Sequence, residues 1–518
     1  MSSLTRREFL AAAAATPAAM RAAQRRPNIL FVMVDEMRWD AMGCEKHPVV
    51  RTPTLDKLAA EGVRFSRAYT VSPVCSPARA SAFTGRYAHV HGVTLNGVPA
   101  NNGEIFLPSI LKHYGYHTAI AGKLHYTPAR FGYGFDQFWS FSSEGPTPEL
   151  GYNEYLRKKH GSPAKFPRKA GTCPWPDDPL GRDVGEFLYP KEDFETEWIT
   201  DRSIEYLRSR KDKQQPWFLF TSFLKPHSPS VEPEPYFSMY DRANFPIPKL
   251  PPNAKEARAA QRERSKRHWV DDERMVRVMS SKYFGAITHV DDQLARLFAE
   301  LRRLGMEDNT LVLFTADHGN MLGEKGRWFK GIQYEGSSHV PLLWKGPKGA
   351  RENGGRVVHR VVENTDLLPS ILETAGIPVP QGVQGRSFLA LARGQDPNWK
   401  NRAYSQLRGG MVVDGDWKLI DNSLDGSGEK ELYNLANDPK EERNLAADPG
   451  QKERVAELTR LLARWRADRP APIKIPGMPT PDYAVISDQE RQKWIRLAPD
   501  NQESAERPAR RREVRKKK

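Results

Sequence analysis

One short segment, from Val74 to Arg86, combines a cysteine, a proline, a glycine and two arginines in a spacing that favours nucleophilic chemistry. Pro77 suits the first turn of a helix and Gly85 suits its end, so we expect Cys75 just before a helix N-terminus. The helix dipole favours negative charge there. Arg79 follows after roughly one helical turn, so its guanidinium can reach back toward Cys75. A lone cysteine is more often a small core residue, but this pattern is more specific than a lone cysteine.

Further polar side chains follow the carboxyl ends of four predicted strands. The i, i+2 spacing of two of the pairs can aim both side chains of a pair the same way. Ligands of open α/β sheets bind outside the carboxyl ends of the strands, so we expect these groups to converge on one site. The strands and the residues after them are Ile29–Val34 with Asp35 and Glu36, Thr118–Ala121 with Lys123 and His125, Trp217–Phe223 with Lys225 and His227, and Thr310–Thr315 with Asp317 and His318.

These motifs and their order resemble the sulfatase family, within the alkaline-phosphatase-like superfamily, over about residues 27 to 450. The resemblance implies that a maturation enzyme oxidises Cys75 to formylglycine (3-oxoalanine), which is an aldehyde. The hydrate of this aldehyde would supply two hydroxyls. One would attack sulfur, and the other would later expel sulfate from the covalent intermediate.

The resemblance also implies roles for the surrounding cations and histidines. Charge develops on the leaving oxygen and on the sulfuryl oxygens in the transition state, so cationic groups near them stabilise it. Lys330 precedes a Tyr-Glu-Gly sequence at the spacing of a sulfate-binding lysine in relatives. We expect Lys123 and Lys330 to clamp the sulfate and Arg79 to orient and stabilise the nucleophile. His125 and His227 would handle protons, one at the hydrated aldehyde and the other at the leaving alcohol, in an order that the sequence leaves open.

Two further residues are candidate substrate contacts. Asn96, in Leu95-Asn96-Gly97, resembles a substrate-contacting asparagine of the branch that contains choline sulfatases and phosphonate monoester hydrolases. Asn-Gly is also a common turn pair. Lys225 either contacts the substrate or snorkels at the rim of the site.

The carboxylates of Asp35, Glu36 and Asp317, with the oxygens of a modified Cys75, make an oxygen-rich group that suits a hard divalent cation. The family usually binds calcium through a pair of aspartates and an Asp-Asn or Asp-His. This sequence has Glu36 where many relatives have aspartate, and His318 where asparagine is common. Because an imidazole ligand is more usual for transition metals, manganese stays an alternative to calcium.

Strands that alternate with helices must position these residues, which predicts an α/β fold. The resemblance implies an alkaline-phosphatase-like large, mostly parallel sheet flanked by helices. After about residue 400, short strand-like pieces and one amphipathic helix predict a smaller C-terminal antiparallel sheet plus helix. The predicted helices are Thr52–Gly62, Leu107–Tyr114, Asp193–Arg210, Tyr283–Leu304 and Gln451–Arg466, and the predicted late strands are Tyr404–Leu407, Gly410–Val413, Trp417–Ile420 and Glu431–Asn434.

The predicted domains follow from these patterns. Residues 27–400 form the catalytic α/β domain, residues 401–470 a small α+β subdomain, and residues 471–518 a C-terminal extension with a disordered basic tail. Residues 141–190 and 225–270 lack clear periodicity, and we interpret them as long insertions that shape a binding site.

Residues 1–26 resemble a twin-arginine signal peptide, with Arg6 and Arg7 ahead of the alanine-rich segment Ala11–Met20. This predicts export by the twin-arginine machinery to a periplasmic or secreted location. Much of the net charge of +15 lies in this segment and in residues 507–518, so the body of the chain is close to balanced. The sequence has no nucleic-acid recognition fold, no apolar run of transmembrane length, and too few cysteines for a disulfide scaffold.

The sequence therefore predicts a sulfatase of the arylsulfatase type or one that acts on sulfated carbohydrate. The first alternative is a phosphonate monoester or phosphodiester hydrolase on the same scaffold, because a tetrahedral anion of similar shape fits the same cations. The second is a non-catalytic polyanion-binding protein on a decayed scaffold. Its signature would be the loss of Cys75, Arg79 or a clamp lysine, and all of these are present.

Overall fold

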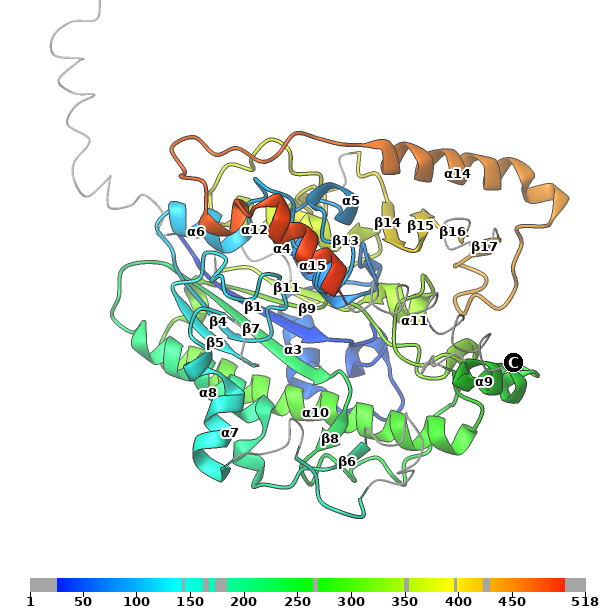
Figure 1. The fold of residues 1–518 in the computed structure, drawn as a ribbon, viewed down its shortest axis with the longest axis horizontal. Helices are drawn as coiled ribbons and strands as arrows, with labels where there is room; N and C mark the ends of the chain where they lie inside the picture. The colour runs from blue at the N-terminus through cyan, green and yellow to red at the C-terminus, as the bar shows by residue number, and fades with distance from the viewer. Residues whose placement is uncertain are drawn as a thin grey trace, which may run out of the picture.

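A computed structural model describes residues 26–141, 145–161, 167–172, 184–263, 269–348, 354–395, 398–422 and 429–498. An eight-stranded sheet lies at its centre, in the order β12-β2-β11-β9-β1-β7-β4-β5 (Figure 1). Neighbours are parallel except where β11 pairs with β9 and β2. The strands are β1 (Asn28–Asp35), β2 (Val63–Phe65), β4 (His117–Gly122), β5 (Gln137–Ser140), β7 (Trp217–Pro226), β9 (Thr310–Ala316), β11 (Leu342–Lys345) and β12 (Arg356–Val358).

Helices cover both faces of this sheet (Figure 1). On one face, Phe83 of α4 packs against Phe31 of β1 and Phe220 of β7, with ring centroids 5.6 and 4.8 Å apart. On the other face, α8 and α10 pack against each other and against β7. Because β1 lies between two parallel strands and between two helical layers, its near-continuous apolar sequence is buried on both sides. The main helices are α3 (Pro53–Glu61), α4 (Cys75–Thr84), α6 (Leu107–His113), α8 (Glu195–Ser209), α10 (Glu273–Arg303) and α12 (Leu367–Thr374).

The predicted fold class is confirmed, and two element boundaries differ from the predictions by more than two residues. Helix α10 begins at Glu273 rather than Tyr283, because the Asp272 side chain caps its first turn by accepting from the Arg274 N–H. Its additional turns bury Met275 and Met279. Strand β7 continues beyond Phe223 to Pro226 and thereby includes Lys225.

The two long insertions contain regular structure of their own. The first holds α7 (Tyr152–His160) and β6 (Val184–Glu186), and the second holds β8 (Ser230–Glu232) and α9 (Ala254–Glu263). Strands β6 and β8 pair with each other in parallel, so the insertions meet beneath α10 (Figure 1). Elements this short carry too few residues to show a period in sequence.

The C-terminal part has the predicted antiparallel sheet and helix. Strands β14 to β17 form a four-stranded sheet in sequence order, and α14 (Lys452–Ala467) packs on it through Leu458, Leu462 and Trp465. Trp465 also stacks on Tyr404 and meets the ring of Tyr87 edge-on. The strands are β14 (Arg402–Leu407), β15 (Gly409–Asp414), β16 (Trp417–Asp421) and β17 (Lys430–Asn434).

The described part of the predicted extension packs on the catalytic domain. The guanidinium of Arg86 donates to the carbonyls of Pro470 and Ala471, and the buried Tyr483 hydroxyl donates to Ser109 Oγ at 2.7 Å. Helix α15 (Asp488–Leu497) follows. The predicted signal peptide, apart from Arg26, and the basic tail lie outside the described residues. Within the described part of the chain, no helix is long and apolar enough to cross a membrane.

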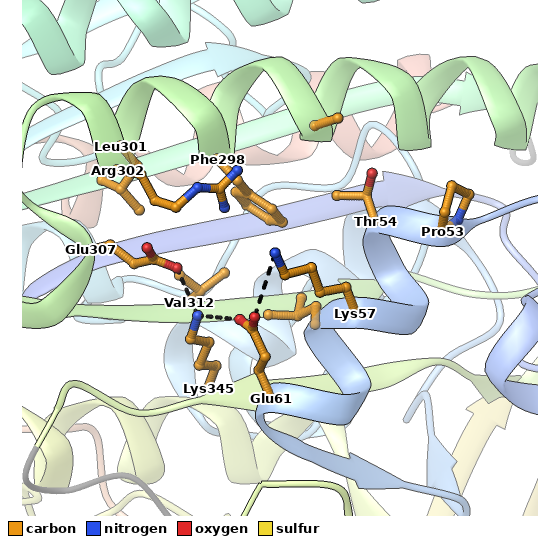
Figure 2. Close-up of a pocket in the computed structure, with 12 residues that line it drawn as sticks. Pro53, Thr54, Lys57, Glu61, Phe298, Leu301, Arg302, Glu307, Val312 and Lys345 are labelled. Carbon is orange, nitrogen blue, oxygen red and sulfur yellow. Dashed lines mark hydrogen bonds and ion pairs between the residues drawn. The ribbon is translucent and has the colours of Figure 1, made fainter.

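A cavity of about 210 Å³ lies between α3 and α10, near the amino end of β9 (Figure 2). Its charged groups pair with one another, since Lys345 Nζ lies 2.6 Å from Glu61 Oε2 and 2.8 Å from Glu307 Oε1. The polar residues picked out by sequence lie instead at the opposite, carboxyl ends of the parallel strands. The candidate site of chemistry therefore lies at that edge.

Candidate active site

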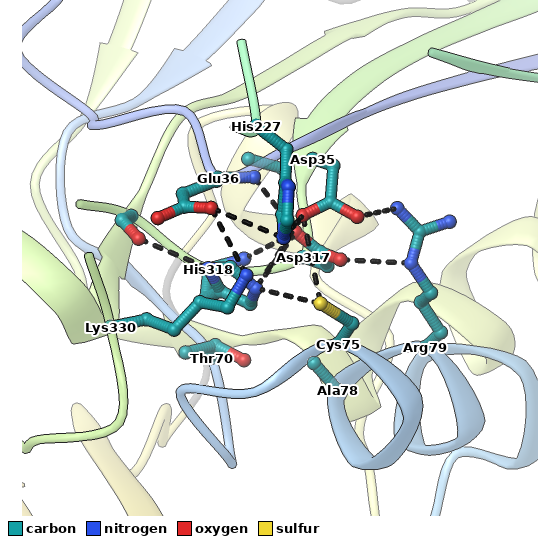
Figure 3. A network of polar contacts seen from close by, with 12 residues as sticks. Asp35, Glu36, Thr70, Cys75, Ala78, Arg79, His227, Asp317, His318 and Lys330 are labelled. Atoms are coloured by element: carbon teal, nitrogen blue, oxygen red, sulfur yellow. Dashed lines mark hydrogen bonds and ion pairs between the residues drawn. The ribbon is translucent and has the colours of Figure 1, made fainter. Parts of the chain in front are cut away.

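Cys75 is the first residue of α4, next to the extended Val74, and Gly85 ends the helix in the left-handed conformation (φ 63°). Its thiol is buried beneath the carboxyl edge of the sheet. Figure 3 shows the sulfur facing the residues that follow β1 and β9. Its Sγ lies 3.6 Å from Asp35 Oδ1 and 3.2 Å from His318 Nε2. The helix N-terminus thus presents residue 75 to an acid–imidazole group.

Arg79 lies one turn into α4, with its guanidinium directed at carboxylates rather than at Cys75. Its Nε donates to Asp317 Oδ2 at 2.8 Å and one terminal nitrogen donates to Asp35 Oδ2 at 3.2 Å (Figure 3). The other terminal nitrogen donates to Ser222 Oγ at 2.8 Å. All four side chains are buried. The guanidinium therefore fixes the two carboxylates relative to each other.

Four residues offer ligand atoms that lie within 4.8 Å of one another: Asp35, Cys75, Asp317 and His318. Two carboxylates, an imidazole and a side chain that would carry oxygen after oxidation fit a divalent cation. The Nδ1 atom of His318 lies 3.0 Å from the Gly319 carbonyl, so Nε2 faces the cluster. Glu36 does not belong to this group of four. Its carboxylate forms a second close group with Asp35 and His227.

Two lysines stand on the more open side of the cluster, since the side chains of Lys123 and Lys330 are 11% and 16% exposed whereas the ligand carboxylates and His318 are fully buried. Lys123 forms an ion pair with Asp35, and Lys330 Nζ lies 3.0 Å from Glu36 Oε2. Burial raises the pKa of the Cys75 thiol, but the charges of Lys123, Lys330 and His318 outweigh it and hold that pKa well below its usual range. A negative charge on residue 75 or on a bound anion is therefore stabilised here.

The two histidines approach the cluster from different strands. The Nε2 atom of His227 lies 3.4 Å from Glu36 Oε2 and 4.0 Å from Asp35 Oδ1, and its side chain is 23% exposed. His125 has a left-handed backbone (φ 67°), and its carbonyl accepts a hydrogen bond from Ser76 Oγ. The nearby His125 side chain further lowers the pKa of Cys75. His125 therefore lies beside residue 75, whereas His227 lies on the more exposed side of the cluster.

The two predicted substrate contacts lie in different surroundings. Asn96 Oδ1 accepts a hydrogen bond from the Ser76 backbone N–H at 2.9 Å, so Asn96 stands beside the start of α4. Lys225 is 1% exposed, and its Nζ donates to the Pro229 carbonyl at 2.6 Å. It lies 3.8 and 3.7 Å from the buried carboxylates of Glu195 and Glu232. The structure therefore does not bring Lys225 into the cluster around Cys75.

Sequence reasoning missed three polar residues that hold the site together. Ser222 binds Arg79, Asn320 Nδ2 donates to Glu36 Oε1 at 2.9 Å, and the Tyr283 hydroxyl donates to the Glu36 carbonyl at 2.8 Å. Asn320 directly follows Asp317-His318-Gly319, and this adjacency was the only sequence signal that could have marked it as a residue of the site. Ser222 and Tyr283 lie within a strand and a helix, where no motif marks them.

Comparisons with known proteins agree with this geometry. The sulfatase family profile matches residues 27–377, and a profile described as N-sulphoglucosamine sulphohydrolase, C-terminal, matches residues 323–468. An arylsulfatase of Clostridium perfringens is 32% identical over 465 residues, covering 85% of this chain and 94% of that protein. The multifunctional alkaline phosphatase superfamily protein PehA of Trinickia caryophylli is 31% identical, covering 86% of this chain and 96% of that protein. The crystal structure of a phosphonate monoester hydrolase of Agrobacterium radiobacter superposes with a TM-score of 0.73 at 25% identity, covering 85% of this chain and 96% of that one.

The fold and the cluster around Cys75 define a hydrolase of the alkaline-phosphatase-like superfamily. Within it, the chain belongs to the sulfatase family, because the family profile spans more than half of its length and the arylsulfatase of C. perfringens matches over 85% of it. The chain is therefore a sulfuric ester hydrolase by family, which confirms the predicted resemblance and class of enzyme.

Proposed function

We propose that this chain hydrolyses a sulfate ester with an aldehyde made from Cys75 and with one divalent cation. The observation that carries the proposal is the buried group of four potential ligands at the N-terminus of α4, with two lysines on its open side. Asp35, Asp317, His318 and the modified residue 75 would hold the cation. Calcium fits the carboxylate oxygens, and manganese is the alternative that the imidazole of His318 favours.

When both groups are present, the hydrated aldehyde supplies the attacking hydroxyl and the cation acts as a Lewis acid and a template. The protein's own side chains do the rest. The ammonium groups of Lys123 and Lys330 bind the non-reacting sulfuryl oxygens and stabilise the charge that develops on them. Arg79 keeps Asp35 and Asp317 in place, because its guanidinium donates to both.

The positions of the histidines favour a division of their roles. The His125 carbonyl accepts from Ser76 Oγ, which places His125 beside residue 75, so it is the residue suited to hold or take a proton there. His227 is partly exposed and faces the open side, where the ester's alcohol would leave. We assign to His227 the proton that the leaving alkoxide or aryloxide oxygen needs.

Hydrolysis of a phosphonate monoester is the second candidate activity. It is favoured by the phosphonate monoester hydrolase structure that superposes with a TM-score of 0.73. A phosphonate monoester presents a tetrahedral anion to the same two lysines. The two activities are separated by kcat/KM on an aryl sulfate and an aryl phosphonate with the same leaving group, measured on matured enzyme with Cys75→Ala as the control. A higher value for the sulfate supports the proposal, and a higher value for the phosphonate favours the second candidate.

We also propose that the protein is exported by the twin-arginine machinery to the periplasm or the medium. The support is the pair Arg6-Arg7 ahead of an alanine-rich segment. The double variant Arg6→Lys/Arg7→Lys should leave active enzyme in the cytoplasm, as shown by fractionating the cells. Unchanged periplasmic activity would contradict this assignment.

A further inference from the structure

The loop of residues 92–106 carries Asn96 to the start of α4. Asn96 Oδ1 accepts a hydrogen bond from the backbone N–H of Ser76, at 2.9 Å, and Ser76 directly follows residue 75. Val74 precedes the helix, and its apolar side chain cannot cap it. The amide of Asn96 therefore takes the place of a capping side chain, which ties the position of this loop to that of residue 75.

The far half of the 92–106 loop is held by the C-terminal extension. The N–H of Gly103 donates to the Ala484 carbonyl at 2.8 Å. Asn102 and Ile486 exchange two hydrogen bonds, because Asn102 Nδ2 donates to the Ile486 carbonyl at 3.0 Å and the Ile486 N–H donates to Asn102 Oδ1 at 3.1 Å. Both family profiles end by residue 468, so these contacts come from a part of the chain beyond them.

Helix α15 adds one arginine that binds the nearer half of the loop. The guanidinium of Arg491 donates to the carbonyl of Pro99, at 3.2 Å, and to that of Ala100. It also donates to Asn101 Oδ1 at 2.5 Å. One side chain with several fixed donors therefore holds three consecutive residues that follow shortly after Asn96.

Polar contacts of this kind keep α15 in place. Figure 1 shows α15 on the same side of the large sheet as α4 and α6. The helix has 10 residues and none of them is buried, so apolar packing contributes little to its docking. A helix this short is marginal in water by itself. A second polar contact is the ion pair of Glu490 with Arg130, at 2.5 Å. Loss of Arg491 should therefore loosen the loop while the buried core of the catalytic domain stays intact.

We infer that Arg491 is a positioning residue for substrate binding, which acts through the 92–106 loop and Asn96. This inference rests on the proposed function. Because Asn96 Oδ1 is engaged by Ser76, Nδ2 is the atom of that amide that can donate to a bound anion. A loop that is fixed before the substrate arrives does not have to be ordered on binding, so Arg491 lowers the entropy cost of binding without contacting the ester.

The test is a double-mutant cycle of Arg491→Ala and Asn96→Ala, measured as KM and kcat/KM on an aryl sulfate with matured enzyme. Arg496→Ala is the matched control, because Arg496 is an exposed arginine of the same helix. Arg491→Ala should raise KM and lower kcat/KM about tenfold, the order expected for the loss of one charge-assisted hydrogen bond. The double variant should be no slower than Asn96→Ala alone, because Arg491 acts through Asn96.

Hydrogen exchange separates this positioning from a general loss of structure. In Arg491→Ala, peptides that cover residues 95–104 and the amide of Ser76 should exchange faster than in wild type, while the free energy of unfolding in urea stays close to the wild-type value. Additive effects of the two substitutions, wild-type kcat/KM in Arg491→Ala, or an equal loss in Arg496→Ala would each overturn the inference. A wild type without sulfatase activity contradicts the proposed function instead, and exchange of the loop peptides then still decides whether Arg491 holds the loop.

Discussion

The Nε atom of Arg79 donates to Asp317 Oδ2 at 2.8 Å, and both side chains are buried. The same guanidinium reaches Asp35. One residue of the Cys-x-Pro-x-Arg motif thus holds the two carboxylates at the carboxyl ends of β1 and β9. The motif therefore links helix α4 to the sheet as well as supplying residue 75.

Replacing Arg79 should damage both the fold and the site. Arg79→Lys keeps a positive charge but cannot donate to two carboxylates in the geometry of a planar guanidinium. Breaking a buried ion pair costs about 3–5 kcal/mol, and we expect a loss near the lower value because the charge remains. Urea denaturation measures this loss, and elemental analysis should show reduced metal content. Wild-type stability together with wild-type metal content would contradict the role assigned to Arg79.

Lys225 and Lys330 should give opposite phenotypes. Lys225 is enclosed with Glu195 and Glu232, and of these two carboxylates Glu232 also pairs with His289. Lys225→Met therefore leaves the buried carboxylate of Glu195 without its neighbouring ammonium group and should destabilise the protein by about 3–5 kcal/mol. KM of the folded variant should change little. Lys330→Met should instead raise KM and lower kcat with a smaller effect on stability. Steady-state kinetics and thermal denaturation of the two variants measure these effects. An increase in KM for Lys225→Met as large as that for Lys330→Met would contradict the assignment.

His289 should make stability depend on pH between about 6.5 and 9. Burial lowers the pKa of His289, but hydrogen bonds to Glu197 and Glu232 outweigh it and raise that pKa to about 9. Because the folded-state pKa is raised, the stabilisation is fully present below pH about 6.5 and is lost as pH rises through 9. The loss amounts to at most about 3 kcal/mol.

Comparison with His289→Gln isolates this contribution from other titrating groups. Denaturant titrations of both proteins from pH 6 to 10 should show a stability difference that shrinks as the pH rises. A difference that stays constant across that range would show that His289 does not change its protonation on folding.

The general position of the site could be predicted from sequence because the geometry of a parallel sheet fixes it. Apolar runs identify β1, β4, β7 and β9, and their carboxyl ends must meet at one edge. That reasoning brought Asp35, Lys123, His227 and Asp317 to one place. The predicted position of the site depends only weakly on strand order. The antiparallel strand β11 between β2 and β9, which the sequence did not predict, therefore leaves it unchanged.

Individual side-chain directions could not be predicted in the same way. The i, i+2 spacing placed Lys225 and His227 on one side, but β7 extends to Pro226 and its register with β1 shifts between Val34 and Asp35. Lys225 is consequently buried against α8. Glu36 diverges from Asp35 because of its left-handed backbone, and no sequence pattern signals such a conformation at a glutamate.

The central claim is that turnover depends on an aldehyde at residue 75. The most direct measurement is peptide mass spectrometry of residue 75 together with kcat on an aryl sulfate, in protein produced with and without the maturation enzyme. We expect kcat to rise in proportion to the fraction of aldehyde and Cys75→Ala to be inactive but folded. Full activity in protein whose residue 75 is entirely unmodified thiol would contradict it.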